Sequence, residues 1–108
     1  MAVIDLSAVN NYPFTKRVAL SATPNTMQQI TIGSRCTQVQ IIFETNSGLV
    51  MTNGGTDNTV ITSEDGYLTV PANSLYYHDL ARAKTQHNIW VASGTGSTVV
   101  SVQLGERD

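Results

Sequence analysis

The sequence predicts an all-β protein, an antiparallel β-sandwich of jelly-roll type with about eight short strands. Val, Ile and Thr make up about 30% of the 108 residues, and β-branched side chains pack well on a pleated sheet. Turn residues interrupt the chain at short intervals, as they do in sandwiches and barrels. A chain of this length is expected to fold around a single hydrophobic core.

Residues 1–16 lack a regular apolar pattern and are assigned to an N-terminal arm or edge strand, ahead of one sandwich domain at 17–108. Val3, Ile4 and Leu6 supply apolar side chains without a common face. The segment is either a first edge strand on the domain's own sheet, which we favour, or an arm that reaches a neighbouring subunit.

Eight strands are expected beyond this segment, because runs rich in β-branched and aromatic residues are bounded there by Gly, Pro, Asn or Ser. They lie at 17–21, 27–32, 38–45, 49–52, 58–62, 67–71, 88–92 and 98–104. The third run alternates apolar and polar residues, so Val39, Ile41 and Phe43 share one face and are expected in the core.

Two hairpins are predicted in the middle of the chain. Asn53-Gly54 separates 49–52 from 58–62, and this dipeptide is a strong hairpin signal because both residues tolerate a positive φ. Gly66 ends the next turn and suits a type I turn followed by a left-handed residue, which would join 58–62 to 67–71.

The C-terminal third is expected to hold an irregular part and a closing hairpin. Residues 72–86 show no strict alternation and are assigned to one helical turn or a crossover between sheets. The runs 88–92 and 98–104 are assigned to the hairpin. Their core positions are Ile89, Val91, Val100, Val102 and Leu104. Trp90 points the other way, toward solvent, a neighbouring loop or a partner.

One group of residues invites a metal or catalytic interpretation. His78, Asp79 and His87 have the side chains to bind zinc or to assist a nucleophile. No further Cys or His completes a tetrahedral set, and no Ser stands out as a nucleophile. Structural or solvent-facing roles are therefore expected, with no metal and no cofactor.

Two further signals have structural explanations. Cys36 follows Arg35, and a neighbouring cation can activate a thiol, yet free cysteines are more often small buried hydrophobic residues. The glycines at 54–55 and 94–96 are followed by strand sequence, whereas phosphate-binding loops need a following helix. The sequence predicts a protein that is not an enzyme.

Charge is the unusual feature of the composition. Asp, Glu, Lys and Arg make up 13% of the chain, about half of what a typical soluble domain carries. A polar surface with few ions favours protein contacts, because few charges lose water when a contact forms. The six basic residues are scattered, so no stripe follows a phosphate backbone and nucleic acid is not an expected partner.

Membrane contact and secretion are not expected either. No apolar stretch approaches the roughly 20 residues that span a bilayer. The first residues lack the basic region and apolar run of a secretory signal. The single Cys36 rules out an intrachain disulfide and suits synthesis in a reducing cytoplasm.

Four segments of the C-terminal 40 residues resemble small virion structural proteins of tailed bacteriophages. They are Val70-Pro71-Ala72-Asn73-Ser74, Tyr77-His78-Asp79-Leu80, Ile89-Trp90-Val91-Ala92-Ser93-Gly94 and Val99-Val100-Ser101-Val102. Such proteins are single sandwiches or jelly rolls that decorate or cement a capsid, or sit at the head-tail junction. The resemblance implies a non-enzymatic virion protein, made in the host cytoplasm, that binds the major capsid protein or other virion subunits as a homo-oligomer, with a trimer favoured.

The expected partner contacts are the arm and the aromatic residues that the core does not need. They are Val3, Ile4, Leu6, Tyr12, Tyr76, Tyr77 and Trp90. Adjacent residues of a strand point to opposite faces, so one of the paired tyrosines is expected at the surface. The alternative function is a carbohydrate-binding or receptor-recognition module, in which Tyr67, Tyr76, Tyr77 or Trp90 stacks on a sugar.

Overall fold

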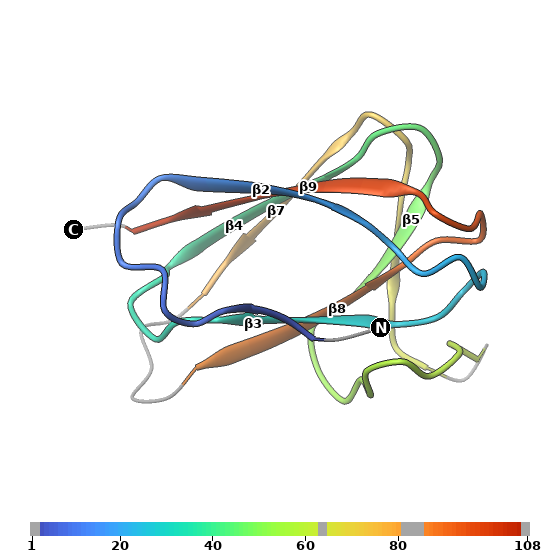
Figure 1. Cartoon of the computed structure of the whole chain (residues 1–108), viewed down its shortest axis with the longest axis horizontal. Coiled ribbons are helices and arrows are strands. Elements are labelled where there is room, and N and C mark those ends of the chain that lie inside the picture. Colours follow the sequence, from blue (N-terminus) through green and yellow to red (C-terminus); the bar gives the residue numbers. More distant parts are fainter. Residues whose placement is uncertain (1–2, 63–64, 81–85, 107–108) are drawn as a thin grey trace.

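The structure, a computed structural model, describes residues 3–62, 65–80 and 86–106. These residues form nine strands and no helix, which confirms the predicted all-β sandwich (Figure 1). The strands are β1 (Ile4–Leu6), β2 (Phe14–Ala19), β3 (Gln28–Ile32), β4 (Gln38–Phe43), β5 (Gly48–Met51), β6 (Leu68–Val70), β7 (Leu75–Asp79), β8 (His87–Ala92) and β9 (Val99–Gly105). In this part of the chain no helix has the length and apolar character of a membrane span.

The strands form two sheets that face each other. Sheet A has five strands in the order β1-β3-β8-β5-β6, and sheet B has four in the order β2-β9-β4-β7. The pair β1 and β3 is parallel, and the other named pairs are antiparallel. Successive edge strands lie on the same side of the sandwich, β1 with β2 and β6 with β7, because short connections link the two sheets there.

The core lies between the sheets and follows the predicted alternation. β4 and β9 alternate buried and half-buried residues, so every second side chain enters the core. Val39, Ile41 and Phe43 are fully buried, as predicted. The five core positions predicted for the last two strands are also in this cluster.

Trp90 faces away from this core and toward a neighbouring loop, one of its predicted surroundings. It belongs to a second apolar cluster on the outer face of sheet A. That cluster contains Met27, Met51, Ile61, Trp90 and Ala92. Residues 52–62 pass beneath sheet A and cover the cluster (Figure 1). The Met27 N–H donates to the Thr59 carbonyl at 2.8 Å, and the Gln29 N–H donates to Asp57 Oδ1 at 2.7 Å.

The two predicted central hairpins are wrong. The segment 58–62 makes one isolated bridge, between Val60 and Thr26, and β5 pairs with β6 instead. Ile61 packs beside Trp90 in the second cluster. Burying the outer face of sheet A outweighs the local hairpin preference of Asn53-Gly54, because an uncovered Trp would leave a large apolar surface in water.

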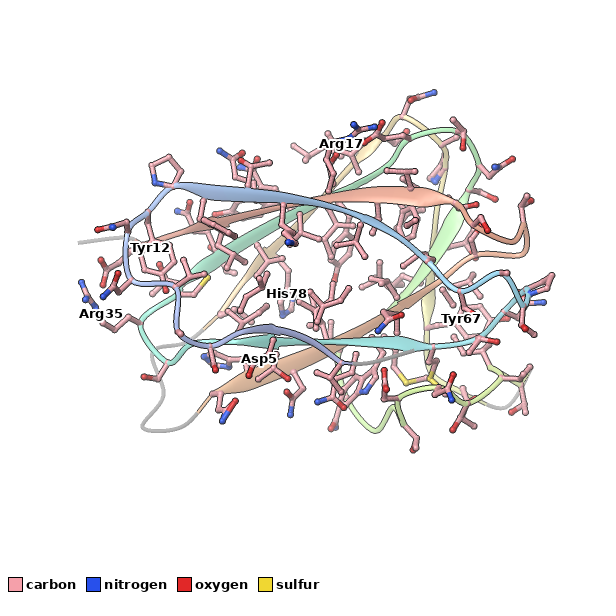
Figure 2. All side chains as sticks on the ribbon, viewed as in Figure 1. Asp5, Tyr12, Arg17, Arg35, Tyr67 and His78 are labelled. Atoms are coloured by element: carbon pink, nitrogen blue, oxygen red, sulfur yellow. The ribbon has the colours of Figure 1, made fainter. Side chains whose placement is uncertain are left out.

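The irregular segment predicted at 72–86 contains the strand β7. Its inward side chains, Tyr76 and His78, carry polar atoms, so the apolar alternation that marks a strand is absent from the sequence. Figure 2 shows His78 between the two sheets. The rest of the predicted segment includes residues 81–85, which lie outside the described residues.

The predicted closing hairpin is also wrong, because β8 and β9 lie in different sheets. Residues 93–98 cross from one sheet to the other. Ser93 Oγ donates to the Ser47 carbonyl at 2.9 Å, and Thr98 Oγ1 donates to Ser93 Oγ at 3.1 Å. These hydrogen bonds give polar groups of the crossing segment their partners. β9 then pairs with a strand on each side, β2 and β4.

The N-terminal segment belongs to the chain's own sheets. β1 pairs with β3, and Leu6 is 6% exposed. The boundary assigned at residue 16 falls inside β2, which begins at Phe14. In the structure of the single chain, this segment contributes an edge strand, β1, to the domain's own sheet, which is the favoured interpretation.

Candidate functional site

Exposed apolar side chains gather on one side of the sandwich. Of the six large apolar residues that are exposed among the described residues, four lie within 67–77. They are Tyr67, Leu68, Leu75 and Tyr77. This stretch contains β6 and β7, the edge strands on one side of the two sheets.

The edge strand β6 borders an apolar hollow of about 260 Å³. Val50, Thr52, Gly66, Tyr67 and Leu68 line it. Leu68 is 58% exposed, and Tyr67 is 37% exposed. We call Tyr67, Leu68 and this hollow the β6 patch.

The outer face of sheet B differs from that of sheet A, because no loop in the described residues covers it. Its register aligns Thr15, Gln103, Gln40 and Tyr77 in one row across the four strands. The parallel rows contain Arg17, Ser101, Ile42 and Leu75, and then Gly105, Gln38 and Asp79. We call this surface the glutamine face.

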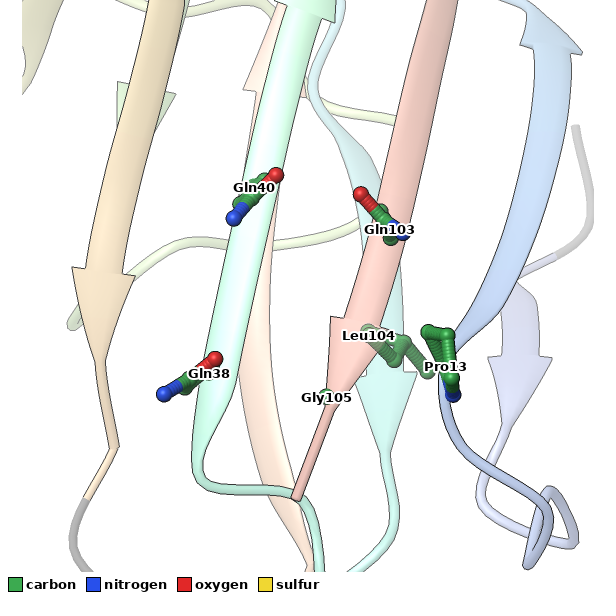
Figure 3. A pocket seen from close by; sticks show the side chains of 6 residues that line it. All are labelled: Pro13, Gln38, Gln40, Gln103, Leu104 and Gly105. Atoms are coloured by element: carbon green, nitrogen blue, oxygen red, sulfur yellow. The ribbon is translucent and has the colours of Figure 1, made fainter. Parts of the chain in front are cut away.

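A second hollow, of about 90 Å³, lies on the glutamine face (Figure 3). Its lining residues are Pro13, Gln38, Gln40, Gln103, Leu104 and Gly105. Figure 3 shows the three glutamine side chains on two neighbouring strands. The hollow exists because Gly105 contributes no side chain between them. A Cβ there would lie 3.2 Å from Gln38 Oε1, tighter than ordinary van der Waals contact.

Tyr77 borders the glutamines on the adjacent strand. It is 43% exposed and lies directly opposite Gln40. Its hydroxyl donates to Asp79 Oδ1 at 2.7 Å, two residues along the same face. This bond holds the hydroxyl end of the ring beside Asp79 on the outer face of the sheet.

The charges Arg17 and Glu44 on this face form an ion pair. The Arg17 guanidinium donates two hydrogen bonds of 2.7 Å to the Glu44 carboxylate, and Ser101 Oγ donates a third of the same length. Figure 2 shows Arg17 on the outer side of sheet B. The bonds from Arg17, followed by the one from Ser101, lower the pKa of Glu44 from 4.5 to about 2.

Acidification is expected to remove a stabilising contribution of Glu44. Because its pKa is lower in the folded chain, the contribution is present above the ordinary value of 4.5 and is lost as the pH falls toward about 2. Thermal melts at several pH values should show a smaller decline for Glu44→Gln than for the natural chain. The difference should be small and should shrink in salt, since the pair is exposed. Equal declines would contradict this.

Most of the predicted contact residues are covered by the chain itself. Tyr12 is half-buried, and its hydroxyl donates to the Val9 carbonyl at 2.9 Å. Trp90 is 9% exposed, and Leu6 is 6% exposed. Ile4 and Tyr76 pack against the main core. The exposed members of the predicted set are Val3 and Tyr77.

The aromatic residues do not gather into one sugar-binding platform. Trp90 lies under residues 52–62, and Tyr76 points inward. Tyr67 lies beside β6, whereas Tyr77 lies on the outer face of sheet B. As predicted, one tyrosine of the adjacent pair is exposed.

The candidate metal and thiol residues are held apart. His78 lies in sheet B and stacks on Tyr76, with ring centroids 6.2 Å apart, while His87 lies in sheet A. No group of three His, Cys, Asp or Glu in the described ranges is arranged to hold a metal. Cys36 is fully buried, and its burial raises the pKa of the thiol. It is the small buried hydrophobic residue that its sequence context favours.

Sequence reasoning missed the glutamines and the β6 patch. Gln38 and Gln40 occupy alternate positions of one strand, and Gln103 lies directly opposite Gln40 on the next. The alternation in 38–43 is visible in the sequence and predicts the buried apolar residues, but it does not show which strand lies beside the glutamines. The pairing of β4 with β9 cannot be read from local sequence.

Comparisons with protein-family models, with curated proteins and with solved structures find no match to this chain. The two exposed surfaces, the β6 patch and the glutamine face, are therefore the features of the chain that indicate a function.

Proposed function

We propose that the chain is a non-enzymatic structural protein of a virion that binds the capsid surface, or the head-tail junction, and associates with copies of itself. The β6 patch carries this proposal. Apolar and aromatic side chains around a hollow are typical of the buried centre of a protein interface.

The edge of sheet A at β6 suits strand addition. Its residues Leu68, Thr69 and Val70 include no charge and no proline, the features that usually discourage pairing at an edge. The edge strand of sheet B on the opposite side, β2, contains the charged residues Lys16 and Arg17. A proline flanks each of these edges, Pro13 before β2 and Pro71 after β6, so the difference between them is the charge within the strand. A partner strand that pairs with β6 through its backbone would place one of its own apolar side chains in the neighbouring hollow.

The composition and the sequence resemblance support the same function. With 13% charged residues, few ions lose water when the surface meets a protein partner. The resemblance to small virion proteins of tailed bacteriophages supplies the partner class, the major capsid protein or other virion subunits.

The test is binding to virus particles assembled without this chain. Leu68→Asp is expected to weaken co-sedimentation with such particles at least tenfold, which corresponds to about 1.4 kcal/mol, because burying an unpaired carboxylate is costly. The natural chain should sediment as a trimer or as another small oligomer.

The matched control is Val60→Asp, which places the same charge at another exposed apolar position, 51% exposed. It should bind like the natural chain. A monomer that binds no particle contradicts the proposal, as does equal binding by the natural chain and Leu68→Asp.

A further inference from the structure

We propose that the glutamine face binds a neutral oligosaccharide, with the Tyr77 ring stacked on one sugar and the amides of Gln38, Gln40 and Gln103 bonded to hydroxyls. This site lies outside the β6 patch and does not depend on the proposed virion function.

The three amides are not occupied by the described part of the chain. None of their side chains hydrogen-bonds to another described residue, and each is only partly buried. Each amide carries two N–H donors and a carbonyl acceptor. Planar groups of this kind can donate to one hydroxyl of a sugar and accept from the next.

The register sets the amides and the ring in one surface. Gln103, Gln40 and Tyr77 are neighbours across three strands, and such neighbours are about 4.8 Å apart. A sugar stacked on Tyr77 therefore places its hydroxyls over Gln40, and the next sugar of a chain reaches Gln103. Aromatic rings with a polar tip suit ligands that have apolar faces and polar edges.

The hollow beside Gly105 adds a place for a projecting group. Its volume of about 90 Å³ is large enough for a small polar group. A hydroxymethyl group that enters the hollow would meet the Gln38 amide.

The charges favour a neutral ligand. Arg17 is the basic residue within the rows of the face, and it is paired with Glu44. Asp79 accepts a hydrogen bond from Tyr77 at the other end. Within the described residues, an anionic sugar over these rows would meet the carboxylates of Glu44 and Asp79 and a guanidinium already paired with Glu44, and removing its charge from water would be costly.

The chemistry of the face favours a sugar over a protein. Three uncharged amides lie at its centre, whereas the centre of a stable protein interface is apolar.

The test is a titration of the full chain with cellohexaose, xylohexaose, chitohexaose and mannohexaose, in which nitrogen-15 NMR spectra are recorded at each sugar concentration. We expect at least one of them to shift the side-chain amide signals of the three glutamines, with a Kd between about 10 μM and 1 mM. Heparin serves as the anionic probe and should not shift them.

Two variants locate the site. Tyr77→Ala should weaken binding at least tenfold, and Gly105→Ala should weaken it several-fold by filling the hollow. Tyr67→Ala removes a tyrosine of similar exposure, 37% against 43%, and should bind like the natural chain. Unchanged thermal melting of each variant shows that folding is retained.

Four results would overturn the inference. Three concern sugar binding itself: no shift with any of the four hexasaccharides, shifts with heparin alone, or equal losses in Tyr67→Ala and Tyr77→Ala. Loss of particle binding in Tyr77→Ala without sugar binding by the natural chain would show a protein contact and would also overturn it. Leu68→Asp should retain sugar binding, so the two proposals fail separately.

Discussion

Replacing Trp90 by alanine is expected to lower the free energy of unfolding by about 3 kcal/mol, the range for removing a large buried aromatic side chain. The indole is 9% exposed and packs with Met27, Met51 and Ile61. Its Nε1–H also donates to Gln29 Oε1 at 3.2 Å. The substitution removes these contacts and leaves a cavity under residues 52–62.

Urea titration of the natural chain and Trp90→Ala measures this change. Tyr77→Ala is the matched control, since it removes an exposed aromatic residue and should cost less than about 1 kcal/mol. The pair separates two roles of an aromatic residue. Trp90→Ala should destabilise the fold and, at temperatures where it is folded, retain sugar binding, whereas Tyr77→Ala should do the opposite. A stable Trp90→Ala that loses sugar binding would contradict this assignment.

The sequence is informative where one face of a strand meets the main core. The alternation of β4 places Val39, Ile41 and Phe43 correctly, because the period of two is a local property. It leaves the surroundings of the second face open where both faces are covered, as for Trp90, which was assigned to solvent, a loop or a partner. Residues 89–92 are apolar on both sides because residues 52–62 cover their outer face, and that cover depends on contacts distant in sequence.

Pairing was the least predictable part of the fold. The turn at 93–97 has the length and glycines of a hairpin, yet it crosses between sheets. Local turn chemistry permits both outcomes. The choice depends on β9 lying between β2 and β4, which gives its backbone partners on both sides.

The candidate sites were predictable only in part. One tyrosine of the adjacent pair Tyr76 and Tyr77 was expected at the surface, because alternation requires one of them to point outward, and the structure exposes Tyr77. The glutamines became a site only through the register between β4 and β9. The β6 patch could be predicted only from the position of β6 at the edge of a sheet, and the sequence of a three-residue strand does not reveal that position.

Replacing Gly48 by alanine is expected to lower the free energy of unfolding by about 3 kcal/mol, the upper part of the usual range for overpacking a core. An added Cβ would clash with the ring of Phe43. That ring is fully buried, so it has no free space to move into. The expected loss of stability therefore comes from this steric clash and not from the backbone conformation of Gly48.

Gly66→Ala is the control for this substitution, because nothing lies within 4 Å of the added carbon. It should change the free energy of unfolding by less than about 0.5 kcal/mol. Urea titration measures both. A Gly48→Ala chain as stable as Gly66→Ala would contradict the packing around Phe43.

A double substitution tests whether the clash is with Phe43 itself. Phe43→Leu shortens the ring and should cost about 1–2 kcal/mol alone. In that background the methyl group of Gly48→Ala enters the vacated space, so the second change should cost little. The two changes should therefore be coupled by about 2 kcal/mol, within the range measured for residues in contact. Additive losses would mean that the added methyl group meets other atoms, and that the contact between β5 and the end of β4 is not what fixes the core at this point.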